Sequence, residues 1–190
     1  MITIRPEAYI DLLLAIDLCP VEISGLGEIE LCGEEKRITE IIIFQQECDL
    51  GGTEFDQHAY HCYLETLIRE GKEETIKNKR LWWHSHVNMP VFFSLTDRLN
   101  IQRFGKLTPQ NCNPWLISIV GNKRHKFNVR FDAFWPRRLG GENLPWAMTE
   151  RRSRAELKEL YQERKPRTEA LVKDLVTVTH LVEDDDDDDD

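Results

Sequence analysis

The sequence lacks the features that define several common classes of protein. Its five cysteines form no Cys-x-x-Cys pair and are odd in number, which argues against a zinc ribbon and against a secreted disulfide framework. No segment approaches the roughly 20 apolar residues of a membrane-spanning helix. Residues 1–6 offer no basic flank followed by an apolar stretch, so we expect no signal peptide and no membrane association. The composition predicts a cytoplasmic protein with reduced thiols.

An extended basic patch is also missing, and we therefore expect no binding to nucleic acid. The 190 residues carry a formal net charge of −9. Glu183 and the run Asp184–Asp190 hold eight of the negative charges, which leaves −1 for residues 1–182. We interpret residues 183–190 as an acidic, disordered tail that aids solubility, or as a docking arm for a basic partner surface.

The hydrophobic content, 41%, is ordinary for a globular chain, and its periodicity predicts an α/β fold. Apolar residues recur at helical spacing in some segments and form short β-like runs in others. The pattern predicts helices over 6–18, 56–70 and 94–104, and strands over 25–31, 38–44, 81–87, 116–120 and 127–134. This order predicts a mixed β-sheet flanked by helices in a domain spanning residues 1–137.

A change in composition follows that domain. Proline and glycine residues near position 140 indicate a linker, and a charged helix is expected over 149–164. An apolar segment follows at 171–182. We therefore predict that residues 138–182 form a linker and a C-terminal helical extension.

The motif that carries chemistry is His84-Ser85-His86 followed, after seven residues, by Ser94-Leu95-Thr96-Asp97. Positions i and i+2 of a strand share one face, so the two imidazoles should project side by side. Asp97 would join them from the first turn of the next helix. Two histidines and one carboxylate suit Zn²⁺ with one coordination position left for water, whose pKa the metal lowers toward about 7.

Such a site also needs a base, and the residues alone leave the choice open. Glu7, Glu22, Glu28 and Glu30 all lie upstream. Plainer readings of the motif also exist. Ser94 and Asp97 alone could be a helix-capping pair, and both histidines could be polar strand residues. His58 and His61 beside Cys62 are better explained as helix surface residues than as a second metal site.

The pattern His-x-His-x7-Ser-x-x-Asp resembles the signature of the JAMM (MPN+) metalloprotease family. That family also has an upstream glutamate in a context similar to Pro-x-Glu-x-x-Gly, which Pro20–Gly25 matches at each fixed position. The resemblance covers residues 5 to 135. It implies a JAB/MPN fold, which is cytidine-deaminase-like. One departure is Val87, where the family usually has proline after the second histidine.

The resemblance implies a role for each motif residue. His84, His86 and Asp97 would bind one zinc ion per chain. Glu22 would be the general base and acid, and Ser94 would hydrogen-bond the oxyanion of the tetrahedral intermediate.

The implied activity is that of a zinc-dependent isopeptidase, similar to prokaryotic JAB proteins. It would cleave after the C-terminal glycine of a ubiquitin-like modifier, in conjugates or in precursors. Its partners would be that modifier, its conjugates and enzymes of the conjugation pathway. Residues 45–55 would act as a flap that adds the substrate tail as a strand, or would be only a surface loop. The alternatives are a peptidase acting on a sulfur-carrier protein and a non-catalytic MPN scaffold.

Overall fold

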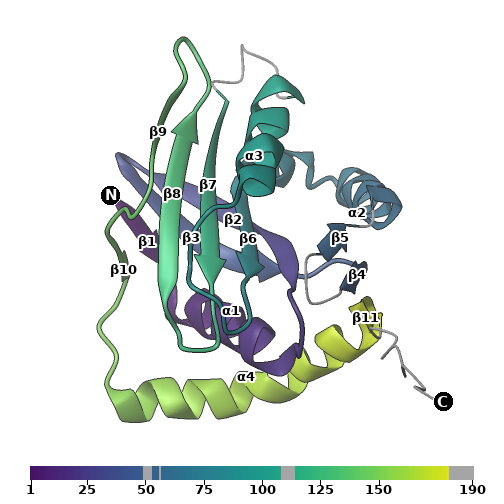
Figure 1. Ribbon diagram of the computed structural model, residues 1–190, viewed down its shortest axis with the longest axis vertical. Coiled ribbons are helices and arrows are strands. Elements are labelled where there is room, and N and C mark those ends of the chain that lie inside the picture. The colour runs from purple at the N-terminus through teal and green to yellow at the C-terminus, as the bar shows by residue number, and fades with distance from the viewer. Residues whose placement is uncertain (49–52, 56, 108–113, 180–190) are drawn as a thin grey trace, which may run out of the picture.

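An eight-stranded mixed sheet forms the centre of the computed structural model, which describes residues 1–48, 53–55, 57–107 and 114–179 (Figure 1). The strand order is β10-β1-β3-β2-β6-β7-β8-β9, and the mixed α/β class is confirmed. The strands of this sheet are β1 (Ile2–Ile4), β2 (Ser24–Cys32), β3 (Glu35–Ile42), β6 (Leu81–Ser85), β7 (Trp115–Gly121), β8 (Phe127–Ala133), β9 (Leu139–Gly141) and β10 (Trp146–Met148). The helices are α1 (Pro6–Leu18), α2 (Gln57–Arg69), the 3₁₀ helix η1 (Glu73–Asn78), α3 (Leu95–Leu107) and α4 (Arg154–Leu175). None of these helices, within the described ranges, is long and apolar enough to cross a bilayer.

Helix α1 covers one face of the sheet and has the predicted bounds. Pro6 stands in its first turn, where the missing N–H costs no helical hydrogen bond. Its residues Leu12, Ala15 and Ile16 are fully buried in the main core against the sheet. A second apolar side of α1 packs against α4, in a separate cluster that includes Leu14.

Helix α3 covers the opposite face, near the middle of the sheet (Figure 1). Phe93 and Ile101 pack there against Leu116 and Val120 of β7. Strand β6 therefore lies between two helical layers and is buried on both faces. Because side chains alternate along a strand, Trp83 belongs to the α1 core, whereas its neighbour Trp82 packs in the α3 cluster.

A glycine on β2 makes room for the packing of β6. An added Cβ at Gly25 would lie 2.2 Å from the carbonyl oxygen of Ile42 and 2.7 Å from the Trp83 ring. The indole of Trp83 lies across this strand and donates to the Leu26 carbonyl at 2.9 Å. The glycine of the Pro20–Gly25 segment is thus required by close packing.

The C-terminal part of the chain, predicted as a linker and a helix, also contributes strands to the main sheet. Strands β9 and β10, in the range predicted as linker, form its two edges by pairing with β8 and β1. Helix α4 begins with a Ser153–Glu156 capping box and continues through Pro166 to Leu175, so the predicted end at residue 164 is wrong. Arg164 fixes it to α1 through two hydrogen bonds to Asp11, of 2.7 and 2.6 Å.

A second, three-stranded sheet lies beside the first, in the order β11-β4-β5 (Figure 1). It consists of β4 (Gln46–Cys48), β5 (Thr53–Phe55) and β11 (Val176–Val178). The segment predicted as a flap thus contributes β4 and β5, and the chain after α4 pairs with β4 in parallel. The predicted acidic tail, 183–190, lies outside the described residues.

Candidate metal centre

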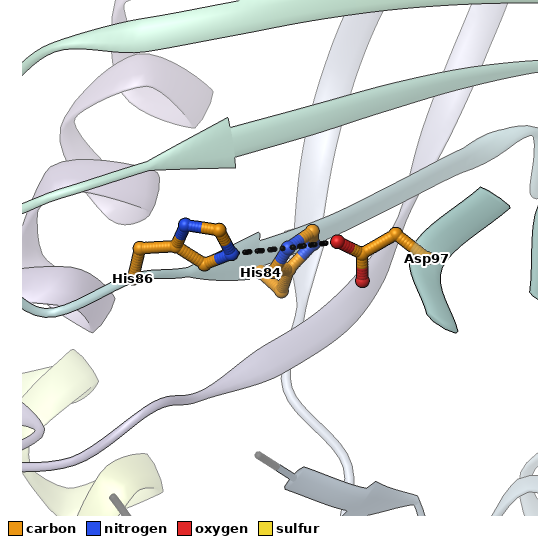
Figure 2. Close-up of side chains that lie close together, drawn as sticks. All are labelled: His84, His86 and Asp97. Atoms are coloured by element: carbon orange, nitrogen blue, oxygen red, sulfur yellow. Dashed lines mark hydrogen bonds and ion pairs between the residues drawn. The ribbon is translucent and has the colours of Figure 1, made fainter. Parts of the chain in front are cut away.

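Three side chains from the predicted motif meet on the α3 face of the sheet (Figure 2). His84 lies near the end of β6, His86 directly follows this strand, and Asp97 comes from the first turn of α3. All three are buried, and their ligand atoms lie within 4.8 Å of one another. Among the described residues, no other group of three or more His, Cys, Asp or Glu side chains has this spacing, and His58, His61 and Cys62 are exposed on α2.

Two of the three distances between the candidate ligand atoms fit a tetrahedral zinc ion. The Nε2 atoms of His84 and His86 are 3.3 Å apart, and Nε2 of His84 is 3.5 Å from Oδ2 of Asp97. Ligand atoms about 2.0–2.1 Å from a tetrahedral zinc ion lie about 3.3–3.4 Å from each other. These donors match zinc in type as well, because zinc accepts imidazole nitrogens and carboxylate oxygens.

Backbone contacts orient the imidazole of His86. Its Nδ1 lies 2.9 Å from the carbonyl oxygen of Pro90, which only accepts hydrogen bonds, so Nδ1 carries the proton. The lone pair of a neutral ring then resides on Nε2, which faces His84. The His84 ring stacks on Trp82, with centroids 4.8 Å apart. Its buried Nδ1 has no hydrogen-bond partner within the described part of the chain, so its polar contacts are made through Nε2.

Asp97 is held as an anion at the start of α3. Its Oδ2 accepts hydrogen bonds from the backbone N–H and the hydroxyl of Ser94, both at 2.7 Å. The Ser94 hydroxyl in turn accepts from the Asp97 N–H at 3.1 Å. Burial raises the pKa of Asp97, but the hydrogen bonds from His84 and Ser94 outweigh burial and lower this pKa to about 2. Capping and metal binding are therefore compatible roles of one Ser-x-x-Asp segment.

Glu22 lies just before β2, the strand that pairs with β6. Ser24 of β2 is directly opposite His84 in the antiparallel β2–β6 pair, so both side chains point to the α3 face. Glu22 is two residues earlier in the chain, and its side chain is 8% exposed. The structure thus places a buried carboxylate next to the strand pair that carries His84.

Two residues outside the predicted set hold the segment of Glu22. Ser85 accepts from the Ile23 N–H through its hydroxyl at 3.1 Å, and its own N–H donates to the Ile23 carbonyl at 2.8 Å. On the other side, the buried amide of Gln46 accepts from the Ser24 N–H at 2.9 Å and donates to the Ser24 carbonyl at 2.8 Å. Strand alternation could have predicted that Ser85, between the two histidines, points to the face opposite them. No local pattern in the sequence marks Gln46.

The loop after His86 differs from the predicted strand. Strand β6 ends at Ser85, although the His86 N–H still bonds the Gly121 carbonyl at 2.8 Å. Val87 has φ 45°, which is rare for a β-branched residue and impossible for proline, whose ring holds φ near −65°. A turn then follows, closed by the Met89 N–H on the His86 carbonyl. Val87 therefore adopts a backbone conformation that a proline at this position could not form.

The fold and this cluster together define an α/β protein with a two-histidine, one-aspartate site at the end of a central strand. No family model matches the chain, and no curated protein matches it. A similar solved structure is the solution structure of protein DSY2949 from Desulfitobacterium hafniense. The two are 15% identical, with a TM-score of 0.48, over 80% of this chain and 94% of that one. This likeness is too distant to assign a family.

Proposed function

We propose that the chain is a zinc-dependent isopeptidase with a JAB/MPN fold, which cleaves after the C-terminal glycine of a ubiquitin-like modifier. One observation carries the proposal. The candidate ligand atoms of His84, His86 and Asp97 lie within 4.8 Å of one another, and the buried Glu22 lies just before the strand that pairs with β6. Both the resemblance of the motif to the JAMM signature and the complete ligand set support this function over a non-catalytic scaffold.

Each residue then has a definite task in amide hydrolysis. His84, His86 and Asp97 would hold the ion, which supplies Lewis-acid activation of water and of the scissile carbonyl. Glu22 would accept the proton of the attacking water and return it to the leaving amine. Ser94, next to Asp97, would donate its hydroxyl to the oxyanion after releasing Oδ2 of Asp97.

The small sheet beside the site would guide the substrate tail. Strand β4 is anchored near Glu22 by Gln46, and both of its edges are occupied, by β5 and by β11. An extended tail would therefore add at the outer edge of β5 rather than to β4. A sulfur-carrier protein with the same kind of tail is the alternative substrate.

Metal analysis combined with a cleavage assay tests the proposal. The purified protein should contain about one zinc per chain and should cleave a reporter peptide fused behind the terminal glycine of ubiquitin-fold proteins from the same genome. Chelation should abolish cleavage and added zinc should restore it. A protein without transition metal that cleaves none of these fusions would instead be a scaffold.

Ser85→Ala tests whether the Ser85 hydroxyl positions Glu22. It removes the acceptor of the Ile23 N–H, so we expect kcat to fall about 10-fold, the size seen when supporting contacts of a site are lost, with zinc content unchanged. Ser85→Thr keeps a hydroxyl and should restore most of the rate. Ser118→Ala is the matched control, because this buried hydroxyl has no hydrogen-bond partner within the described residues. Equal rates for the Ser85→Ala and Ser118→Ala variants would contradict the positioning role.

A further inference from the structure

Large apolar side chains are exposed beside the candidate metal centre. Met89, Phe92, Leu95 and Leu99 are 45%, 50%, 74% and 45% exposed. They make up four of the ten exposed large hydrophobic residues in the described chain, yet they fall within eleven consecutive positions. Scattered exposed leucines are normal, but a cluster of this kind marks a site of interaction.

The outer face of α3 extends this patch and adds positive charge. At 100° per residue, Leu95, Arg98, Leu99, Arg103 and Lys106 all lie on one side of the helix. Each of these residues is exposed. Residues 87–107 contain one acidic residue, Asp97, which is buried in the metal cluster. The patch is therefore apolar with a basic margin.

The patch is continuous with the candidate metal centre. The Phe92 ring meets the ring of His86 edge-on, with centroids 5.1 Å apart. Leu95 is two residues before Asp97, on the outer side of the same helical turn. A molecule bound to the patch would thus border the two ligands that come from the β6–α3 segment.

The composition of the patch fits the centre of a protein interface. The largest apolar patch on a typical monomer exposes roughly 300–600 Å² and is often functional. Aromatic residues and methionine are enriched at interfaces, and this patch contains Phe92 and Met89.

The charge distribution favours a different protein over a second copy of this chain. In a two-fold symmetric contact, this face would meet itself. Arg98 is paired with Glu142 at 2.7 Å, but Arg103 and Lys106 would then oppose the same two cations, which is unfavourable. A partner with acidic side chains around an apolar patch would complement the face.

We propose that this surface, formed by Met89, Phe92, Leu95, Leu99 and the basic margin of α3, binds the folded body of the modifier. The inference rests on the proposed function, in which the tail of that modifier enters the metal centre. It adds that the modifier presents an apolar patch edged by acidic side chains. Affinity for the substrate then comes largely from this contact, outside the reacting groups.

Leu95→Glu tests the surface with two substrates of the same modifier: the folded fusion to a reporter peptide, and a peptide that carries only its tail. Glutamate at the first helical position suits the helix dipole, so folding should be retained. We expect kcat/KM on the folded fusion to fall 10- to 100-fold, with cleavage of the tail peptide and zinc content unchanged. Arg103→Glu should lower kcat/KM on the fusion in the same selective way. Leu31→Glu, at a 58% exposed leucine on β2, is the matched control.

The outcomes separate this proposal from the proposed function. If the wild-type protein cleaves both substrates and Leu95→Glu cleaves the fusion equally well, the docking surface is wrong and the enzymatic assignment stands. If Leu95→Glu also loses zinc or peptide cleavage, the residue supports the metal centre instead. A wild-type dimer that Leu95→Glu dissociates would assign the surface to self-association. If the wild type cleaves neither substrate, both proposals fail.

Discussion

Glu22→Gln is expected to abolish hydrolysis while the protein keeps its zinc. The amide has the size of the carboxylate but accepts no proton at neutral pH, so neither proton transfer of the proposed reaction can occur. General acid–base catalysis contributes about 100- to 10,000-fold in enzymes. Because Glu22 would serve in both steps, we expect a loss of kcat/KM near the upper end of that range.

The contacts that hold the backbone beside Glu22 do not involve its side chain. The backbone around Glu22 is held by Ser85 and Gln46, through groups that the change does not touch. The three candidate metal ligands are elsewhere, on β6, directly after it, and on α3. Elemental analysis and kcat/KM on a cleavable fusion are the measurements. Glu30→Gln, at a half-exposed carboxylate of β2, is the control and should be fully active. A Glu22→Gln variant within 10-fold of the wild type would exclude Glu22 as the base.

Local sequence patterns were sufficient for the three candidate ligands. His84 and His86 are two positions apart on a strand, and Asp97 lies at the start of a helix with Ser94 as its cap. Each placement depends on backbone geometry within a few residues, which strand alternation and capping rules describe. Glu22 could be chosen among the upstream acids only through the resemblance to a known signature. Its position relative to β6 depends on long-range pairing, as in the Ile23–Ser85 hydrogen bond between residues sixty-two positions apart.

The supporting contacts and the sheet edges were not predictable in this way. Gln46, at the start of β4, contacts Ser24, at the start of β2, only because the tertiary fold brings the two together, and no local pattern encodes that approach. Strands β9, β10 and β11 have three residues each, too few for a periodic signal. Proline normally interrupts a helix because it lacks an N–H, yet α4 continues through Pro166. The helix is held against α1 by Arg164 and by a Tyr161–Asp17 hydrogen bond of 3.0 Å. Tertiary contacts outweighed the local preference there.

Asp97→Asn is expected to remove most of the zinc affinity without unfolding the start of α3. The wild-type carboxylate has a pKa of about 2, so it is fully ionised at neutral pH and releases no proton when it binds a cation. Asparagine keeps an oxygen that can accept the Ser94 hydrogen bonds but removes the negative charge. Loss of a supporting contact costs 10- to 100-fold in metal affinity, and loss of a charged ligand should cost more than about 100-fold.

Ser94→Ala separates the capping role of this segment from its role as a metal site. It deletes the hydroxyl that accepts from the Asp97 N–H, and should destabilise the fold by about 1 kcal/mol. The carboxylate remains, so zinc affinity should fall no more than about 10-fold. Thermal unfolding with and without zinc measures both effects, because a ligand that binds the folded state raises its stability by about 4 kcal/mol at 1,000 times its Kd. Zinc should therefore stabilise the wild type and Ser94→Ala far more than it stabilises Asp97→Asn. Equal stabilisation of all three proteins would mean that the ion binds elsewhere, and that Asp97 only caps its helix.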